Sequence, residues 1–242
     1  MQQIELELAG GGVLTVSLRA SLDAMPAVKQ RPLVLVVPGG GYNHVSPREG
    51  DPVALQFAAA GYHTAVLTYS VGEGAQNYQP LRQLNEALAL LRQNAGEWHI
   101  LPDKIAVCGF SAGGHLALSA AVLDIPGETA QQRPNAVILG YPVITAGEFA
   151  HRGSFVQLAG SEDAAAQQAF TLEDKTVPVE NTLLLLAALR RADVPCEAHL
   201  FEKGAHGTSI STAEVDAADP HRAHWVALCL EWLGETFGFK LS

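Results

Sequence analysis

Cysteine is scarce in this sequence: Cys108, Cys196 and Cys229 are the only three, and they lie far apart with no CxxC pair. A disulfide framework or a cysteine-based zinc site needs paired or closely spaced cysteines, so the sequence indicates neither. We interpret all three as buried thiols. The sequence also has no apolar run of the ~18 residues that a spanning helix needs, and no secretory leader pattern at its start. We therefore expect a cytoplasmic protein that does not engage a membrane.

Basic residues are also few, because Lys and Arg number 15 against 25 Asp and Glu, for a formal net charge of −10. Nucleic acids and anionic membrane surfaces attract proteins through clustered Lys and Arg. The charge balance therefore excludes nucleic acid as an expected partner. A neutral or cationic small molecule remains as the expected substrate. The protein could also form a homo-oligomer.

The composition is that of a soluble globular protein, since 48% of the residues are hydrophobic and 17% are charged. A chain of 242 residues could form one α/β domain or two small ones. We find no internal repeat and no low-complexity linker. We therefore expect a single domain over residues 1–242.

Short apolar segments alternate with segments of helical periodicity along most of the chain. The chain opens with a pattern typical of a β-hairpin, formed by residues 4–8 and 13–18 around a triple glycine. Further strands are expected at 31–37, 63–69, 105–108, 135–141 and 195–201, and helices at 51–61, 81–96, from 114 onward, 179–191 and 219–234. This alternation predicts an α/β fold with a mostly parallel sheet, helices on both faces and ligands at the carboxyl ends of the strands.

The segment 104–122, KIAVCGFSAGGHLALSAAV, predicts a short buried strand, a tight turn and a helix of small residues. Ser111 would lie at the tip of the turn, between Gly109 and Gly113. A turn this tight brings neighbouring backbone close, so small residues are needed two positions before and after the serine. A GxSxG pattern also occurs in ordinary turns, but the strand before it and the helix after it favour a nucleophile elbow. Ser111 is therefore the expected nucleophile.

A serine hydroxyl is a weak nucleophile at neutral pH, so it needs a histidine base and a carboxylate that orients this base. One known order along the chain is serine, acid, histidine. His206 lies in a Gly-Ala-His-Gly loop after an expected strand, which favours it as the base. Asp174 precedes Thr-Val-Pro-Val and a helix, as a loop acid at a strand end would. Glu173 and Asp163 are the alternative acids.

The triple glycine at 39–41 directly follows the expected buried strand 31–37. Hydrolysis of an acyl compound needs backbone N–H donors at the point where the carbonyl oxygen becomes negative. We expect Gly40 and Gly41 to supply one such donor and Ala112 the other, which would form an oxyanion hole. Tyr42 and His115 are the residues that we expect to bind the substrate.

Sites for nucleotides and metals are not indicated. The glycine loop matches neither GxxxxGK[ST] nor a GxGxxG that opens a helix. Five further histidines match no catalytic metal motif in their spacing, and we interpret them as core or surface residues: His44, His115, His151, His221 and His224. We therefore expect neither a cofactor nor a metal ion.

Together these residues resemble the α/β-hydrolase superfamily, in particular bacterial esterases of the acetyl xylan esterase and feruloyl esterase type near the dienelactone hydrolases. The resemblance rests on five segments: VVPGGGYNHVSPREGDPVALQFAAAGY, VCGFSAGGHLA, AVILGYPVITAGEFAHRGSF, VPVENTLLLLAALRRADVP and FEKGAHG. It implies a single α/β-hydrolase domain that hydrolyses short-chain carboxylic esters, including acetyl esters of carbohydrates. It also implies that Ser111, Asp174 and His206 form a catalytic triad without cofactor or metal.

The sequence departs from the family at 167–173, where QQAFTLE leads directly into Asp174. The family has a pronounced apolar strand before its acid loop, and this segment offers few apolar or β-branched residues. Two explanations stay open, a natural deletion and a segment absent from the sequence as given. Besides an esterase, we therefore keep a weakly active or non-catalytic member of the superfamily, and a small peptidase, as alternatives.

Overall fold

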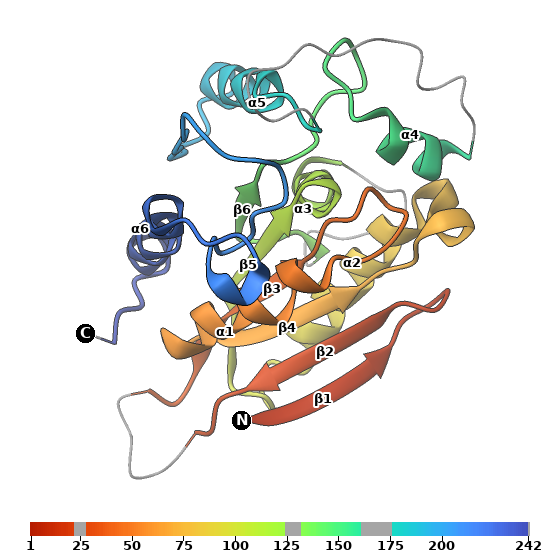
Figure 1. The fold of residues 1–242 in the computed structure, drawn as a ribbon. Helices are drawn as coiled ribbons and strands as arrows, with labels where there is room; N and C mark the ends of the chain where they lie inside the picture. The colour runs from red at the N-terminus through yellow and green to blue at the C-terminus, as the bar shows by residue number, and fades with distance from the viewer. Residues whose placement is uncertain (22–27, 124–131, 161–175, 242) are drawn as a thin grey trace.

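The computed structural model describes residues 1–21, 28–123, 132–160 and 176–241, and Figure 1 shows a central sheet with helices on both sides. The strands are β1 Gln2–Glu7, β2 Val13–Leu18, β3 Arg31–Val37, β4 His63–Thr68, β5 Ile100–Phe110 and β6 Ala136–Gly140. The helices are α1 Asp51–Ala59, α2 Gln79–Gln93, α3 Ala112–Val122, α4 Arg152–Ala159, α5 Glu180–Arg191 and α6 Pro220–Phe237. Short 3-10 helices are η1 Pro47–Glu49, η2 Gly72–Tyr78 and η5 Ala213–Val215.

The sheet has six strands in the order β1-β2-β4-β3-β5-β6. Strands β4, β3, β5 and β6 run parallel to one another. Strand β1 pairs antiparallel with β2, and β2 pairs antiparallel with β4. The predicted hairpin and the predicted parallel sheet are thus confirmed. The carboxyl ends of β3, β5 and β6 meet at one edge, where a parallel sheet of this class places its ligands.

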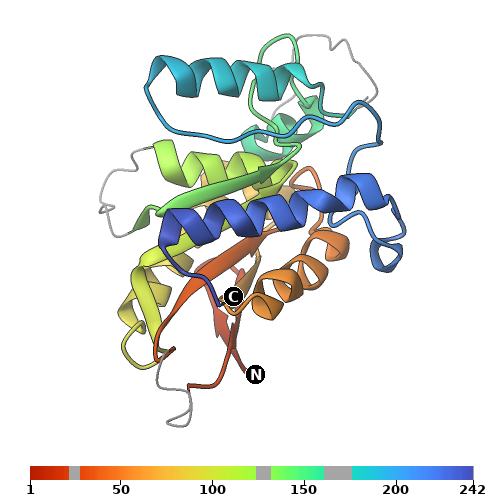
Figure 2. The ribbon, with the colours of Figure 1, turned by 90° about the vertical axis from the view of Figure 1, so that its left-hand side faces the viewer.

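Alternating side chains of β3 enter two separate cores. Leu33, Leu35 and Val37 pack in the core beneath α2 and α3, whereas Val34 and Val36 pack in the core beneath α1 and α6. All residues of β3 are buried, as expected for a strand covered on both faces. Figure 2, turned by 90°, shows α6 and α1 covering one face of the sheet. The buried centre of the sheet holds β3 and β5 rigidly, and both strands lead into the candidate site.

The strand expected at 195–201 is not formed, and this prediction is wrong. The residues adopt no regular secondary structure and are mostly exposed. A strand needs a neighbour for its backbone N–H and C=O groups, and in the part of the chain that the structure describes, the sheet ends at β6. Cys196 lies on this segment and is exposed, whereas Cys108 is buried and Cys229 is partly buried. The prediction of three buried thiols is therefore wrong for Cys196.

No helix of the described residues is both long and apolar enough to cross a membrane.

His63 is a buried titratable group at the amino end of β4, whereas the candidate site lies at the carboxyl ends of the parallel strands. Its side chain is 1% exposed, Nδ1 accepts the backbone N–H of Arg19 at 3.0 Å, and Nε2 lies 3.3 Å from the carbonyl oxygen of His99. Burial lowers the pKa of His63 to about 4, although the hydrogen bond to His99 opposes this shift. The imidazole is therefore neutral in the folded protein at pH 7.

We expect the free energy of unfolding to fall as the pH drops from about 6.5 to about 4, because the unfolded chain then binds a proton on His63 that the folded chain does not bind. The contribution of this group is on the order of 3 kcal/mol across the window. Urea unfolding of the wild type and of His63→Gln at several pH values measures it. A variant whose pH dependence equals that of the wild type would contradict the assignment to His63.

Candidate active site

Ser111 lies at a sharp turn between the end of β5 and the start of α3. Its backbone angles are φ 52° and ψ −118°, a region that side-chain-bearing residues rarely adopt and that costs about 1–3 kcal/mol. Hydrogen bonds hold this conformation: the Ser111 N–H donates to the carbonyl of Gly140 at 2.9 Å, and the Ser111 carbonyl accepts the N–H groups of His115 and Val143, each at 3.1 Å. The turn therefore has the geometry of a nucleophile elbow.

The two glycines around Ser111 are required by close packing of the backbone. A Cβ on Gly109 would lie 2.2 Å from the carbonyl oxygen of Gly113, and a Cβ on Gly113 would lie 2.1 Å from the carbonyl oxygen of Val37. Both contacts are with backbone, which cannot move aside without shifting β3 or α3. Each glycine of the GxSxG pattern is therefore required, because a side chain at either position would collide with backbone atoms.

His206 and Ser111 are 95 positions apart in the sequence, and the structure brings them together. The distance between Nε2 of His206 and Oγ of Ser111 is 2.8 Å, so the hydroxyl can donate its proton to the ring. The His206 ring also packs against the ring of Tyr141 in an edge-to-face arrangement, with ring centroids 4.7 Å apart. Gly204 and Gly207 flank the histidine with φ of 137° and 77°, values that glycine adopts without strain. The predicted base and the predicted nucleophile are thus in contact.

The glycine loop after β3 lies against the serine. A Cβ on Gly39 would be 2.9 Å from Cβ of Ser111, and a Cβ on Gly40 would be 2.0 Å from the carbonyl oxygen of His44. The N–H of Gly39 donates to Oε2 of Glu49 at 2.8 Å. In the described part of the chain, the N–H groups of Gly40, Gly41 and Ala112 donate no hydrogen bond to another residue. These three donors are therefore the ones that could bind an oxyanion.

Tyr42 and His115 contact each other beside the elbow. The hydroxyl of Tyr42 lies 2.8 Å from Nδ1 of His115, and Tyr42 is 1% exposed. Phe155 of α4 also packs against the histidine, in an edge-to-face arrangement with ring centroids 5.5 Å apart. Burial lowers the pKa of His115 to about 4, so its ring is neutral at pH 7. The structure places Tyr42 and His115 in contact with each other. Their role in substrate binding stays a prediction.

The expected acid lies outside the described residues. Asp174 and its alternatives Glu173 and Asp163 all belong to 161–175, so the structure does not place them. The assignment of the acid therefore stays a prediction.

Sequence reasoning missed three residues next to the candidate site: Glu49, Tyr141 and Ser209. Glu49 is 3% exposed and its Oε1 accepts the hydroxyl proton of Tyr141 at 2.7 Å, while the N–H of Ser209 donates to the oxygen of Tyr141 at 2.9 Å. In the sequence, Glu49 looks like a solvated acid near the start of a helix. Only its position before the helix at 51 could have singled it out, and that signal is weak.

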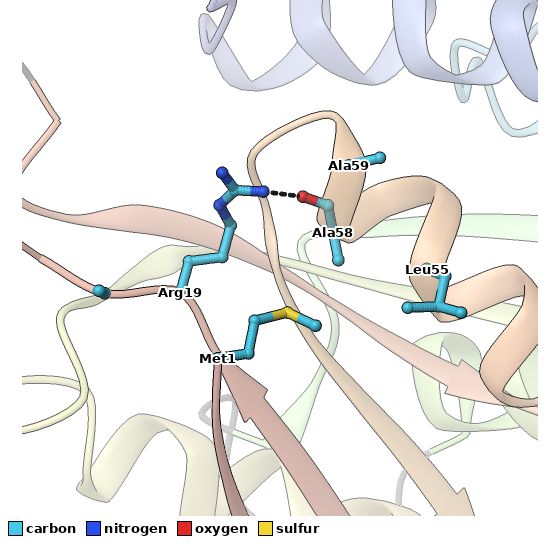
Figure 3. Close-up of a pocket in the computed structure, with 6 residues that line it drawn as sticks. Met1, Arg19, Leu55, Ala58 and Ala59 are labelled. Carbon is cyan, nitrogen blue, oxygen red and sulfur yellow. Dashed lines mark hydrogen bonds between the residues drawn. The ribbon is translucent and has the colours of Figure 1, made fainter.

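A surface hollow of about 410 Å³ lies at the other end of the sheet, where β2 ends and α1 ends (Figure 3). It is lined by Met1, Arg19, Ala20, Leu55, Ala58 and Ala59. The guanidinium of Arg19 donates to the carbonyl of Ala58, so the one charged side chain that lines the hollow already has an acceptor. Because Ser111 lies at the carboxyl end of β5, this hollow is not part of the candidate site.

Comparison with known proteins supports the same assignment of the fold. The BD-FAE family model matches residues 23–127. An endo-1,4-β-xylanase B of Butyrivibrio fibrisolvens is 32% identical over 76% of this chain, and an acetylxylan esterase of Xylanibacter ruminicola is 29% identical over 74%. The chain spans only 34% and 41% of these two relatives, so their activities are not transferred to it on this ground.

A solved structure matches over nearly the full length of both chains. It is MGS-M1, an α/β hydrolase enzyme from a Medee basin deep-sea metagenome library, which is 33% identical with a TM-score of 0.81 and coverage of 98% of this chain and 98% of that chain. The order of the strands, the elbow at Ser111 and this similarity agree. The chain belongs to the α/β-hydrolase family.

Proposed function

We propose that this protein hydrolyses carboxylic esters through an acyl-enzyme formed on Ser111. The observation that carries the proposal is the 2.8 Å contact between Nε2 of His206 and Oγ of Ser111 at a nucleophile elbow. His206 accepts the hydroxyl proton as Oγ attacks the ester carbonyl, and it then gives this proton to the leaving alcohol. A water molecule, deprotonated by His206, releases the acid and restores Ser111. The reaction needs neither cofactor nor metal.

The N–H groups of Gly40, Gly41 and Ala112 stabilise the tetrahedral oxyanion in this proposal. Support comes from the glycine loop lying against Ser111 and from the lack of another acceptor for these donors among the described residues. Ala112 also begins α3, so the helix dipole favours negative charge at its N–H.

Short acyl groups, above all acetyl groups on carbohydrates, are the proposed substrates. Support comes from the acetylxylan esterase relative, which is 29% identical to this chain. Hydrolysis of peptides is the second chemistry that a serine nucleophile could perform, and the experiment below separates the two.

The proposal is tested with p-nitrophenyl acetate, butyrate and octanoate, acetylated xylo-oligosaccharides and a set of peptide p-nitroanilides. We expect hydrolysis of the acetyl and butyryl esters, release of acetate from the oligosaccharides, and no cleavage of the anilides. The Ser111→Ala variant serves as the blank for each substrate. Cleavage of anilides alone would favour a peptidase, and a folded protein without any Ser111-dependent hydrolysis would favour a non-catalytic role.

We expect Gly40→Val to lower kcat by about 10²–10³-fold with a much smaller rise in KM, because the side chain would displace the loop that carries two oxyanion donors. The clash is with backbone, since a Cβ on Gly40 would lie 2.0 Å from the carbonyl oxygen of His44. Gly11→Val is the matched control: Gly11 also has a positive φ, of 94°, but a Cβ there meets nothing within 4 Å. Wild-type kcat in folded Gly40→Val would contradict the role of this loop.

A further inference from the structure

Glu49 is a buried carboxylate that the proposed chemistry does not use. It ends η1, is 3% exposed, and forms no ion pair with Lys or Arg within the described ranges. Removing a carboxylate from water costs several kcal/mol unless hydrogen bonds compensate for the lost solvation. A buried charge without a cationic partner therefore indicates a specific task for its hydrogen bonds.

Both oxygens of Glu49 face hydrogen-bond donors. Oε2 accepts the backbone N–H of Gly39 at 2.8 Å, and Oε1 accepts the hydroxyl proton of Tyr141 at 2.7 Å. Because each oxygen acts as an acceptor, the ionised form fits this site, and hydrogen bonds to an ionised group are the stronger kind. Burial, followed by the charge of Glu49, raises the pKa of Tyr141 well above its ordinary value, which keeps the phenol protonated as a donor.

The same hydrogen bonds reach the loop that carries His206. The oxygen of Tyr141 accepts the N–H of Ser209 at 2.9 Å, and the carbonyl of Ser209 accepts Nε1–H of Trp225 in α6 at 3.0 Å. The Tyr141 ring itself packs on His206. One carboxylate thus connects the glycine loop with the end of β6 and with the segment three residues beyond the base.

Glu49 also accepts the first N–H group of the glycine loop, that of Gly39. A Cβ on Gly39 would lie 2.8 Å from Oε2 of Glu49 and 2.9 Å from Cβ of Ser111, so the carboxylate and the serine both pack against the position where this glycine lacks a side chain. Since the N–H of Gly39 points at Glu49, the next two N–H groups, of Gly40 and Gly41, are those left for a substrate. A loop made of three glycines has little stiffness of its own.

We infer that Glu49 is a positioning residue that fixes the glycine loop and the His206 loop relative to Ser111 through Gly39, Tyr141 and Ser209. The inference rests on the proposed function, since it assigns these loops to the oxyanion hole and the base. It predicts that loss of the carboxylate harms the transition state more than the binding of the ground state.

Glu49→Gln is the principal test, because glutamine keeps the shape but offers one acceptor oxygen for two donors. We expect kcat for p-nitrophenyl acetate to fall about 10²-fold with little change in KM. Phenylboronic acid, which forms a tetrahedral adduct on a serine, should bind more weakly by a similar factor, whereas the inhibition constant of the product acetate should hardly change. Glu5→Gln is the control, since Glu5 is exposed on β1 and its loss changes the net charge equally.

Tyr141→Phe tests the same connection independently, even if Glu49→Gln is insoluble, because it removes one hydroxyl and keeps the ring that packs on His206. We expect kcat to fall about 10-fold, as loss of a hydrogen bond to a charged group implies. In the double variant the two losses of kcat should not multiply, since both substitutions break the same hydrogen-bond network.

Wild-type kcat and boronate affinity in folded Glu49→Gln, or losses of kcat that multiply in the double variant, would overturn the inference. Failure of the proposed function gives a different result. The wild type itself would then show no Ser111-dependent hydrolysis, and the inference about Glu49 would be wrong together with the proposed function.

Discussion

Replacement of Ser111 by alanine is expected to lower kcat by about 10⁶-fold, because loss of the nucleophile of a serine triad removes the acyl-enzyme route. The hydroxyl that donates to His206 at 2.8 Å is the only group removed, and the substituted residue stays at the start of α3. Substrate affinity should change little, since the oxyanion donors belong to the backbone. Initial rates with p-nitrophenyl acetate, at enzyme concentrations high enough to detect the residual turnover, measure the effect.

Covalent labelling gives an independent measurement of the same prediction. A fluorophosphonate should add one mass adduct to the wild-type protein, located on the peptide that contains Ser111, and none to Ser111→Ala. Ser17→Ala, which removes a hydroxyl from the N-terminal hairpin, is the matched control and should label and turn over like the wild type. Labelling of Ser111→Ala at another serine, or full activity of that variant, would show that the nucleophile is misassigned.

The described fold was largely predictable from local patterns of hydrophobicity. The buried strand β3 follows from an unbroken apolar run, and α2 from leucines that recur at helical spacing, because each pattern depends on residues close in the sequence. The segment 195–201 shows the limit of such patterns. Its alternation is typical of a strand, but a strand forms only beside a partner, and the partner is a property of the whole sheet.

The candidate site was predictable where chain order and turn chemistry identify its residues. Ser111 and His206 follow from glycine-flanked turns in the order that this family uses. Glu49 and Tyr141 could not be found in this way, because they are 92 positions apart and meet only when β6 and the glycine loop end at the same edge of the sheet. A buried carboxylate and a solvated one look identical in a sequence.

The chain just after Asp174 is firmly attached to the carboxyl edge of the sheet. Asn181 is fully buried, and its Oδ1 accepts the N–H groups of Ile144 and Thr145 at 2.8 and 3.0 Å. Its Nδ2 donates to the carbonyls of Phe149 and Pro178 at 2.9 and 3.1 Å. Pro178, four positions after Asp174 in the sequence, is thereby held beside the segment that follows β6, at the edge where Ser111 and His206 meet.

Replacement of Asp174 by asparagine is therefore expected to lower kcat by about 10⁴-fold, as found when a triad histidine loses the carboxylate that orients it. His206 presents Nε2 to Ser111, so the acid must act on Nδ1, where it fixes the tautomer and stabilises the imidazolium. KM should change little, because the acid of a serine triad acts on the histidine and not on the substrate. Measurement of kcat for Glu173→Gln and Asp163→Asn as well distinguishes the three carboxylates, since only the variant of the true acid should show the large loss of kcat. If all three variants retain wild-type kcat while Ser111→Ala is inactive, none of these residues orients His206, and the assignment of the acid to this segment is wrong.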